Sequence, residues 1–487
     1  MTRLHDLTAL EQAAAVRAGE VSPSELVEHS LGRIDALDAA LGAFLTVTPE
    51  HARASARRAE ALLRTGGELP PLLGVPTAIK DLNNTAGVRT TFGSRVLADF
   101  VPAVDDAVVT KLAAAGTISL GKTNTPEFGF PCYTDNDLVG PARCPWDPTR
   151  LAGGSSGGAA VAVAAGMVPF AQGSDGGGSI RIPASVNGLF GIKPSRGRVS
   201  NAPYGGDVTG LGTNGPLART VRDAAAMLDA MAGPVLGDPA WAPPLPPGES
   251  FLDWAGQAPG SLRIGRYLQS PVPGIELEPE VAGAFEDAAR LLEDLGHRVD
   301  DVPAGLLGPD VLPSFEQVWA LSGTTLPVPP ERAGELRPLT RELRGRGLAM
   351  SAQAAMESML ALRLFSRRFL RATADFDVLL APVCTMTPRP LGWFDADGDG
   401  AADFERQKRY AAFTALFNVT GQPAVSVPLH ETPDGLPIGT MLVGRPADDA
   451  LLLALSAQLE EARPWAHRHP ASWDQASQEE ASWDDDR

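Results

Sequence analysis

Residues 151–195 read LAGGSSGGAAVAVAAGMVPFAQGSDGGGSIRIPASVNGLFGIKPS and form the most informative segment of the chain. It holds two serines in glycine-rich clusters, Ser155 and Ser179, which stand 24 positions apart. Between them, residues 159–165 are small and apolar and predict a tightly packed, buried helix. Glycine lets a backbone approach a bound molecule closely and adopt positive φ angles. The triple glycine at 176–178 therefore predicts a nest of amide N–H groups, the arrangement that a developing oxyanion needs.

The sequence before this segment changes from a helical to a mixed pattern. Residues up to about 65 are predicted to be helical, and Ser22-Pro23-Ser24-Glu25 is a capping box with proline at the first helical position. A strand, a helix ending at Gly116 and a second strand are then expected over residues 74–80, 105–115 and 117–120. Such alternation favours an α/β fold with a mixed sheet.

The sequence after this segment carries fewer signals. Residues 233–262 are rich in proline and glycine and predict a surface loop. Long helical patterns lie near 277–296 and 350–373, and strand-like runs return from residue 376 before one closing helix. The end of the chain is acidic and polar and is expected to fray.

Composition and charge exclude several classes of protein. Of the 487 residues, 44% are hydrophobic, enough for a sizeable core. A net charge of −18 repels phosphate backbones and argues against nucleic-acid binding. The three cysteines form no disulfide framework, and no signal peptide or membrane-spanning stretch is visible. A cytoplasmic protein without membrane association is therefore expected.

Three short motifs match signatures whose context is missing. Residues 116–123 fit the phosphate-loop pattern, but a helix precedes them and a strand follows, whereas that loop follows a strand and opens a helix. Residues 119–122 fit S-x-x-K without the partner motifs of that class. Residues 395–400 open like a calcium loop whose twelfth position, Arg406, is no ligand. We expect a helix, turn and strand at 116–123 and an acidic surface turn at 395–400.

Residues 153–157, Gly-Gly-Ser-Ser-Gly, also satisfy the G-x-S-x-G pattern of α/β-hydrolases. That chemistry needs a histidine and an acid after the serine, and the histidines that follow it are His297, His430, His467 and His469. None of them stands out, and His430 stays open as the partner of Ser155. The histidines show no metal-ligand spacing, so no metal site is expected.

The chain resembles the amidase signature family. The resemblance is carried by GVPTAIKD at 74–81, GGSSGG at 153–158 and GSDGGGSIRIPA at 173–184, and it extends to 121–129, 188–200 and 417–428. Residues 10–230 match well and 376–465 recognisably, whereas 235–375 carry no matching motif. The resemblance implies one large α/β domain with a central mixed β-sheet that helices cover on both faces.

The resemblance also implies an amide hydrolase with a Ser–Ser–Lys triad, an acyl-enzyme and no cofactor. Carried over by position, Ser179 is the nucleophile, Ser155 is the bridging serine after a cis peptide bond, and Lys80 is the base. The oxyanion hole is formed by the amides of Ser179 and of Gly176, Gly177 and Gly178. The supporting residues are Ser156, Ser174, Asp175 and Arg181.

The physical chemistry of lysine agrees with this assignment. Free lysine has a pKa of about 10.4 and is a poor base at neutral pH. Burial favours the neutral amine and lowers the pKa, and the apolar Val75 and Ile79 near Lys80 suit a buried strand. A neutral Lys80 can accept a proton from Ser155, which in turn accepts one from Ser179.

Two departures from the family pattern bear on the substrate. Residues 173–179 read GSDGGGS where the family often has GTDTGGS, and Val186-Asn187-Gly188 replaces Phe-Cys-Gly. The triple glycine is similar to hydrolases of the 6-aminohexanoate cyclic dimer, so that subgroup is one hypothesis for a linear or cyclic amide substrate. Two alternatives stay open: an amidotransferase A-type subunit that acts on glutamine with partner subunits, and a Ser-His-acid esterase.

The resemblance predicts a single domain over residues 1–487 that hydrolyses carbon–nitrogen bonds other than peptide bonds (EC 3.5). Its expected parts are a helical N-terminal segment (1–70), a signature core (71–230) and a variable region (231–375). A return to the core (376–465) and an acidic tail (466–487) follow. The expected partner is a small-molecule amide, with no nucleic acid and no membrane, and the chain is expected to be a monomer or homodimer. Candidates to line the pocket are Cys132, Tyr133, Trp319 and Cys384.

Overall fold

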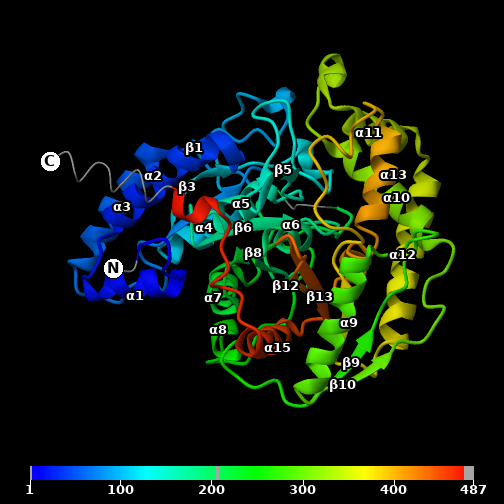
Figure 1. The fold of residues 1–487 in the computed structure, drawn as a ribbon. Coiled ribbons are helices and arrows are strands. Elements are labelled where there is room, and N and C mark those ends of the chain that lie inside the picture. Colours follow the sequence, from blue (N-terminus) through cyan, green and yellow to red (C-terminus); the bar gives the residue numbers. More distant parts are fainter. Residues whose placement is uncertain (1–2, 205–207, 476–487) are drawn as a thin grey trace.

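The computed structural model describes residues 3–204 and 208–475. Its centre is a mixed sheet of eleven strands in the order β1-β3-β2-β6-β8-β7-β12-β13-β11-β9-β10 (Figure 1). A separate two-stranded sheet pairs β4 with β5. The expected α/β fold with a central mixed sheet is thus confirmed.

The strands of the large sheet are short, and most are buried along their length. They are β1 (Phe44–Val47), β2 (Pro76–Lys80), β3 (Ile118–Thr123), β6 (Phe170–Asp175), β7 (Phe190–Lys193), β8 (Thr213–Ala218), β9 (Arg263–Arg266), β10 (Arg298–Asp301), β11 (Val378–Pro382), β12 (Ala424–Glu431) and β13 (Pro437–Gly444). The small sheet is formed by β4 (Arg143–Cys144) and β5 (Asp147–Leu151).

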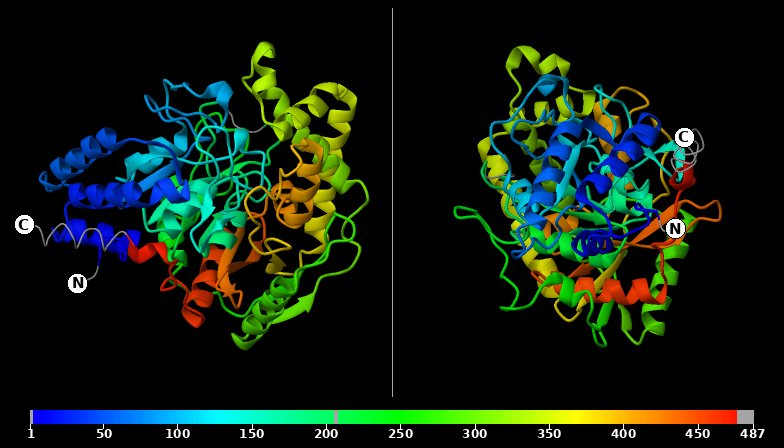
Figure 2. Two further views of the ribbon diagram at one scale, coloured as in Figure 1. Left: turned by 45° about the horizontal axis from the view of Figure 1, so that its top comes forward. Right: turned by 90° about the vertical axis from the view of Figure 1, so that its left-hand side faces the viewer.

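Helices alternate irregularly with the strands along the described chain. They are α1 (Ala9–Ala18), α2 (Pro23–Leu41), α3 (Pro49–Leu63), α4 (Ala107–Ala114), α5 (Gly157–Ala164), α6 (Arg181–Asn187), α7 (Val221–Met231), α8 (Phe251–Trp254), α9 (Pro279–Asp294), α10 (Val311–Ser322), α11 (Pro338–Ala349), α12 (Ala352–Ala372), α13 (Gly400–Tyr410), α14 (Leu416–Thr420) and α15 (Asp449–Ala462). The N-terminal helices α1–α3 and the helices α10–α13 lie at opposite ends of the molecule (Figure 2).

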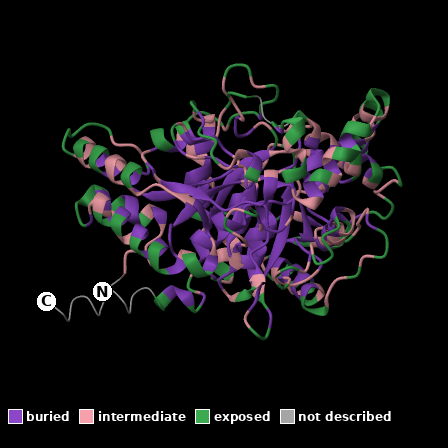
Figure 3. Cartoon of the chain, turned by 90° about the horizontal axis from the view of Figure 1, so that it is seen from above, coloured by how far each residue is buried: buried purple, intermediate pink, exposed green. Residues whose placement is uncertain are grey.

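Helices cover both faces of the sheet, because side chains alternate along each strand. On β11, Val378 and Leu380 pack in one core cluster with α4, α7, α9 and α15. Leu379 and Ala381 point the other way, into a cluster with α10, α12 and α14. Figure 3 shows the result, a buried sheet between helices that expose only their outer sides.

The parallel strands of the sheet determine where polar side chains meet. Strand β2 pairs in parallel with β3 on one side and with β6 on the other, the second time only through Ile79 and Gln172. The three strands therefore end at one edge of the sheet, where ligands bind in open α/β sheets. Lys80 ends β2 and Asp175 ends β6 at this edge.

Several local predictions agree with the structure. Ser22 and Glu25 form the expected capping box at the start of α2. Residues 116–123 run from the end of α4 through Gly116 (φ 92°) into β3, as a helix, turn and strand. All residues of α5 are buried. Asp399 lies in the turn at 395–400 and caps α13.

Two expectations differ from the structure. The N-terminal region contains the strand β1, which pairs antiparallel with β3 and which the helical pattern did not indicate. The tail was expected to fray from residue 466, but Trp473 is only 1% exposed. Residues 476–487 of that tail lie outside the described residues.

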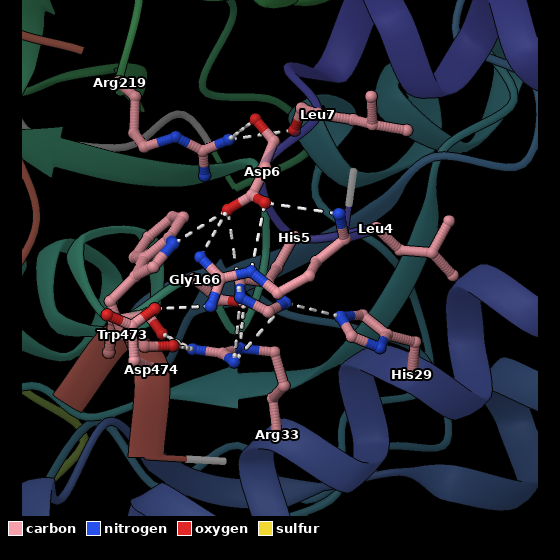
Figure 4. Close-up of polar contacts among 12 residues, drawn as sticks. Leu4, His5, Asp6, Leu7, His29, Arg33, Gly166, Arg219, Trp473 and Asp474 are labelled. Atoms are coloured by element: carbon pink, nitrogen blue, oxygen red, sulfur yellow. Dashed lines mark hydrogen bonds and ion pairs between the residues drawn. The ribbon is translucent and has the colours of Figure 1, made fainter. Parts of the chain in front are cut away.

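The contacts of Trp473 join the two ends of the described chain (Figure 4). Its indole donates to the carboxylate of Asp6 at 3.0 Å, and its carbonyl oxygen accepts from the guanidinium of Arg33 at 3.1 Å. Arg33 also donates to the carbonyl oxygens of Ala165 and Gly166, directly after α5. A single buried arginine thus connects α2, the end of α5 and the C-terminal turn.

Within residues 3–204 and 208–475, no helix is both long enough and apolar enough to cross a membrane.

Candidate active site

Lys80 lies at the end of β2 with its side chain buried in the sheet edge. Its Nζ donates to Ser155 Oγ at 2.8 Å and to the carbonyl oxygen of Ser174 at 3.2 Å. The amide of Lys80 donates to Gln172 Oε1 at 2.9 Å, so that a side chain of β6 continues the hydrogen bonding where the strand pairing ends. The lysine amine is therefore held against a serine hydroxyl.

The pKa of Lys80 is lowered to about 7 because burial disfavours the ammonium form. The negative charge of Asp175 opposes this shift and does not cancel it. A large part of the lysine is then neutral near pH 7, and a neutral amine beside a hydroxyl can accept its proton.

Ser155 is held in a tightly packed turn before α5. The peptide bond between Gly154 and Ser155 is cis, and the carbonyl oxygen of Ser155 accepts from Thr125 at 3.0 Å. The glycines around it are required by space. A Cβ on Gly154 would lie 2.5 Å from the carbonyl carbon of Tyr133, and one on Gly158 would lie 2.3 Å from the amide nitrogen of Asn124.

Ser179 follows the triple-glycine turn after β6. Its carbonyl oxygen accepts from the amide of Ser156 at 3.1 Å, which ties the two serine clusters together. The hydroxyls of Ser155 and Ser179 share one cleft, and no hydrogen bond joins them in this structure. Such contacts are often long in enzymes without substrate and shorten on binding.

The triple-glycine turn presents three unengaged amides rather than four. The amide of Gly178 (φ 137°) donates to Asp175 Oδ1 at 2.7 Å. The expectation that this N–H is a donor to an oxyanion is therefore wrong. Among the described residues, no hydrogen bond engages the amides of Gly176, Gly177 and Ser179. These three are the donors available to a ligand.

A buried ion pair supports the turn. The guanidinium of Arg181 donates two hydrogen bonds of 2.9 Å to the carboxylate of Asp175. It also donates to the carbonyl oxygen of Thr414 and to Asn418 Oδ1. Burial alone would raise the pKa of Asp175, but the Arg181 guanidinium holds it well below its usual range. Ser156 bonds both the amide and the carbonyl of Ser174. The residues expected to support the site thus lie directly beneath it.

Two cavities meet at Ser179. The narrow pocket, of about 80 Å³, is lined mainly by Ile182, Val311, Leu312, Phe315, Ala415 and Leu416. The wide cleft, of about 440 Å³, is lined by Ser155, Gly176, Thr209, Thr324, Thr325 and Met359, among others. Phe130 and Trp319 line both.

Of the four residues that the sequence offered as pocket-lining candidates, two line a cavity at Ser179. Cys132 and Trp319 line the narrow pocket, whereas Tyr133 and Cys384 lie in other cavities. Phe315 and Gln407 were not singled out, because α10 and α13 carry no motif.

The histidines of the chain lie away from these cavities. All seven are within the described residues, and none lines the narrow pocket or the wide cleft. His430 faces Asp287 and Arg463, and His297 bonds the amide of Leu262 and Gln458. The geometry therefore offers Ser155 a lysine and no imidazole. Among the described residues, no cluster of histidine, cysteine or carboxylate side chains suits a metal ion.

Comparisons with known proteins match nearly the whole chain. A sequence model of the amidase family matches residues 25–453. The chain is 36% identical to a 6-aminohexanoate-cyclic-dimer hydrolase of Paenarthrobacter ureafaciens over 490 residues, covering 95% of this chain and 96% of that protein.

Two solved structures share the fold. A 6-aminohexanoate cyclic dimer hydrolase complexed with substrate superposes with a TM-score of 0.88 at 33% identity, over 96% of this chain and 99% of the other. A bacterial aryl acylamidase of the amidase signature family superposes with a TM-score of 0.86 at 29% identity, over 98% and 99%.

Proposed function

The chain belongs to the amidase family, and on this premise we propose that it hydrolyses a carboxylic amide to a carboxylate and an amine through a Ser–Ser–Lys mechanism. Ser179 is the nucleophile, Ser155 relays protons, and Lys80 is the base. The reaction falls among hydrolases of carbon–nitrogen bonds other than peptide bonds (EC 3.5). Linear and cyclic amides are both candidate substrates, and the 36% identity to a 6-aminohexanoate-cyclic-dimer hydrolase makes that cyclic diamide one of them.

One observation carries the proposal. The buried Lys80 amine lies 2.8 Å from Ser155 Oγ, and burial lowers its pKa to about 7. Ser155 shares the wide cleft with Ser179, beside the unengaged amides of Gly176 and Ser179. A base, a relay, a nucleophile and oxyanion donors thus lie around one space.

In the first half-reaction, Ser179 Oγ bonds to the amide carbon. Its proton passes to Ser155, whose own proton passes to Lys80. The carbonyl oxygen becomes an oxyanion that accepts from the amides of Gly176, Gly177 and Ser179. The carbon–nitrogen bond then breaks, and the nitrogen takes a proton back from Lys80 through Ser155. An amine leaves and an ester to Ser179 remains.

In the second half-reaction, water replaces the amine. Lys80 accepts a proton from water through Ser155, and the hydroxide oxygen bonds to the ester carbon. The bond to Ser179 breaks, and the proton returns to its oxygen. The products are the free enzyme and the carboxylic acid, which releases its proton to solvent as the carboxylate, so no oxidant, reductant or cofactor is consumed.

Ser179→Ala tests the proposal directly. We expect the variant to fold and to lose amine release from linear, aryl and cyclic amides by at least about 10⁴-fold, as losses of serine nucleophiles do. A fluorophosphonate should label the Ser179 peptide of the natural protein. Ser55→Ala, on the outer helix α3, is the matched control and should keep full activity. Full activity in Ser179→Ala, or label on Ser155 alone, would overturn the assignment.

A further inference from the structure

We infer that the narrow pocket holds the acyl part of the substrate and the wide cleft the leaving amine, with Trp319 as the partition between them. The preferred substrates are then linear amides of short, uncharged, apolar acids. This inference rests on the proposed Ser–Ser–Lys mechanism and adds the orientation and class of the substrate.

The proton path fixes the orientation. The leaving nitrogen must receive its proton from Ser155, so it must lie on the Ser155 side of the reacting carbon. Ser155 lines the wide cleft and not the narrow pocket, whereas Ser179 lines both. The nitrogen substituent therefore extends into the wide cleft. The acyl substituent, on the other side of the carbon, is directed into the narrow pocket.

The lining of the narrow pocket selects an uncharged acyl group. Apart from Ser179, Cys132 and Gln407, its side chains are apolar except for Lys408. The amine of Lys408 is already paired with Glu316 and Glu405. A charged acyl group would lose its hydration here without gaining a free counter-charge. Glutamine, whose acyl part carries an ammonium and a carboxylate, does not fit this pocket.

Trp319 packs over the triple-glycine turn and between two other aromatic rings. A Cβ on Gly176 would lie 3.4 Å from Trp319 Cη2, so the indole covers the backbone of that glycine. Phe130 packs edge-on and Phe315 stacks against the indole, each with ring centroids 5.8 Å away. A linear amide can extend past the indole on both sides. A small ring that joins its acyl and amine parts must cross the indole, so Trp319 disfavours it.

The wide cleft accepts a larger and more varied amine. Its volume is about 440 Å³ against about 80 Å³ for the narrow pocket. Its outer lining includes the hydroxyl residues Ser322, Thr324 and Thr325. Apart from Asp175, which Arg181 engages, no charged side chain lines it among the described residues. The amine part is therefore selected less strictly than the acyl part.

A matrix of amides tests the orientation. Acetyl, butyryl, hexanoyl and octanoyl amides of ammonia, aniline and naphthylamine are assayed for kcat/KM by amine release. We expect kcat/KM to fall at least about tenfold once the acyl chain is longer than the narrow pocket can hold. One methylene too many in a closely fitting apolar pocket lowers kcat/KM by about this factor. At a fixed acyl group, replacing aniline by naphthylamine should change kcat/KM by less than about threefold.

Two matched variants separate the cavities. Phe315 lines only the narrow pocket and Met359 only the wide cleft. Phe315→Ala should raise kcat/KM for the longest acyl group relative to butyryl at least about tenfold, while Met359→Ala should leave that ratio unchanged. Leu312→Ala, in the same pocket wall, replaces Phe315→Ala if that variant fails to fold. Trp319→Ala should raise kcat/KM for the cyclic diamide, relative to that for linear amides, by a similar factor.

The outcomes distinguish this inference from the proposed function. If amides are hydrolysed but Phe315→Ala changes amine preference instead of acyl preference, the orientation is wrong and the mechanism stands. The inference is also overturned if kcat/KM of the unmutated enzyme is higher for glutamine or for the cyclic diamide than for every linear amide. If no amide is hydrolysed and no reagent labels Ser179, the proposed function itself fails.

Discussion

Lys80 and Lys122 lie on the neighbouring strands β2 and β3, and both side chains are fully buried. Lys80 contacts a hydroxyl and a carbonyl, those of Ser155 and Ser174. Lys122 faces the carboxylate of Asp81 at 3.4 Å and donates to Thr90 at 2.9 Å. Burial lowers the pKa of each lysine, but Asp81 opposes the shift at Lys122 at contact distance.

On the proposed mechanism, the two lysines differ in the groups that they contact and not in their burial. A carboxylate in contact with a buried ammonium opposes the loss of the ammonium's proton, because the pair is stabilised as long as both charges remain. An amine that faces only neutral oxygens can release the proton and accept another. We therefore expect changes at Lys80 to act on the reaction and changes at Lys122 to act on the stability of the fold.

The largest expected effect is that of Lys80→Arg on catalysis. Arginine keeps its positive charge at working pH and cannot accept a proton from Ser155. We expect kcat/KM to fall by roughly 10²–10⁴-fold, the usual contribution of a general base. Amine release measures the loss, and circular dichroism checks the fold. If Lys80→Arg keeps much of the rate, Lys80 only stabilises charge and is not the base.

The next effect is that of Lys122→Met on stability. Removing the lysine leaves Asp81 buried without its counter-charge, which should cost about 3–5 kcal/mol in the free energy of unfolding. Urea denaturation measures it, and Asp81→Leu in the same chain should restore part of the loss. The folded variant should keep its kcat/KM. A variant of normal stability without activity would place Lys122 in the reaction.

The pH dependence of kcat/KM is a second test of Lys80 as the base. If Lys80 is the base, as we propose, it must be neutral to act, so activity should be present above its pKa of about 7 and should be lost as the pH falls through that value. We expect kcat/KM to decline about tenfold per pH unit on the acid side and to level off on the alkaline side. A pH–rate profile with a linear amide measures this. A profile that is flat down to the carboxylate range would contradict a titrating Lys80.

The smallest effects are expected away from the lysines. His430 bonds Asp287 and Arg463 and lines neither cavity at Ser179. His430→Ala should therefore change kcat/KM by less than about threefold, and a chelator should leave the rate unchanged. A loss of about 10³-fold in His430→Ala would restore the Ser-His-acid interpretation.

The sequence predicts the parts of this molecule that depend on near neighbours. The capping box at Ser22 acts over three residues, and the buried helix α5 is visible as a run of small apolar residues. Gly154 and Gly158 are needed because a Cβ on either would lie within 3 Å of backbone atoms. Sequence motifs contain Lys80, Ser155 and Ser179, so these residues could be identified from the sequence. The structure then places them at one edge of the sheet.

The walls of the two cavities were not predictable in the same way. Phe315 and Met359 lie on α10 and α12, and Lys408 of α13 pairs with Glu316 of α10 from 92 positions away. No periodicity along the chain says which helix faces will meet across such distances. The engagement of the Gly178 amide by Asp175 was also missed, because it depends on the turn's backbone angles.

The contact between Asp6 and Trp473 has a consequence for the order of folding. It joins residues 467 positions apart and so closes almost the whole described chain into a loop. The entropy of closing such a loop opposes the contact until the sheet between the two residues has formed and brought them together. We therefore expect this contact to form last during refolding. In pulse-labelling hydrogen exchange, protection of the Trp473 segment should appear after that of β2 and β6, so the joined ends report that folding is complete.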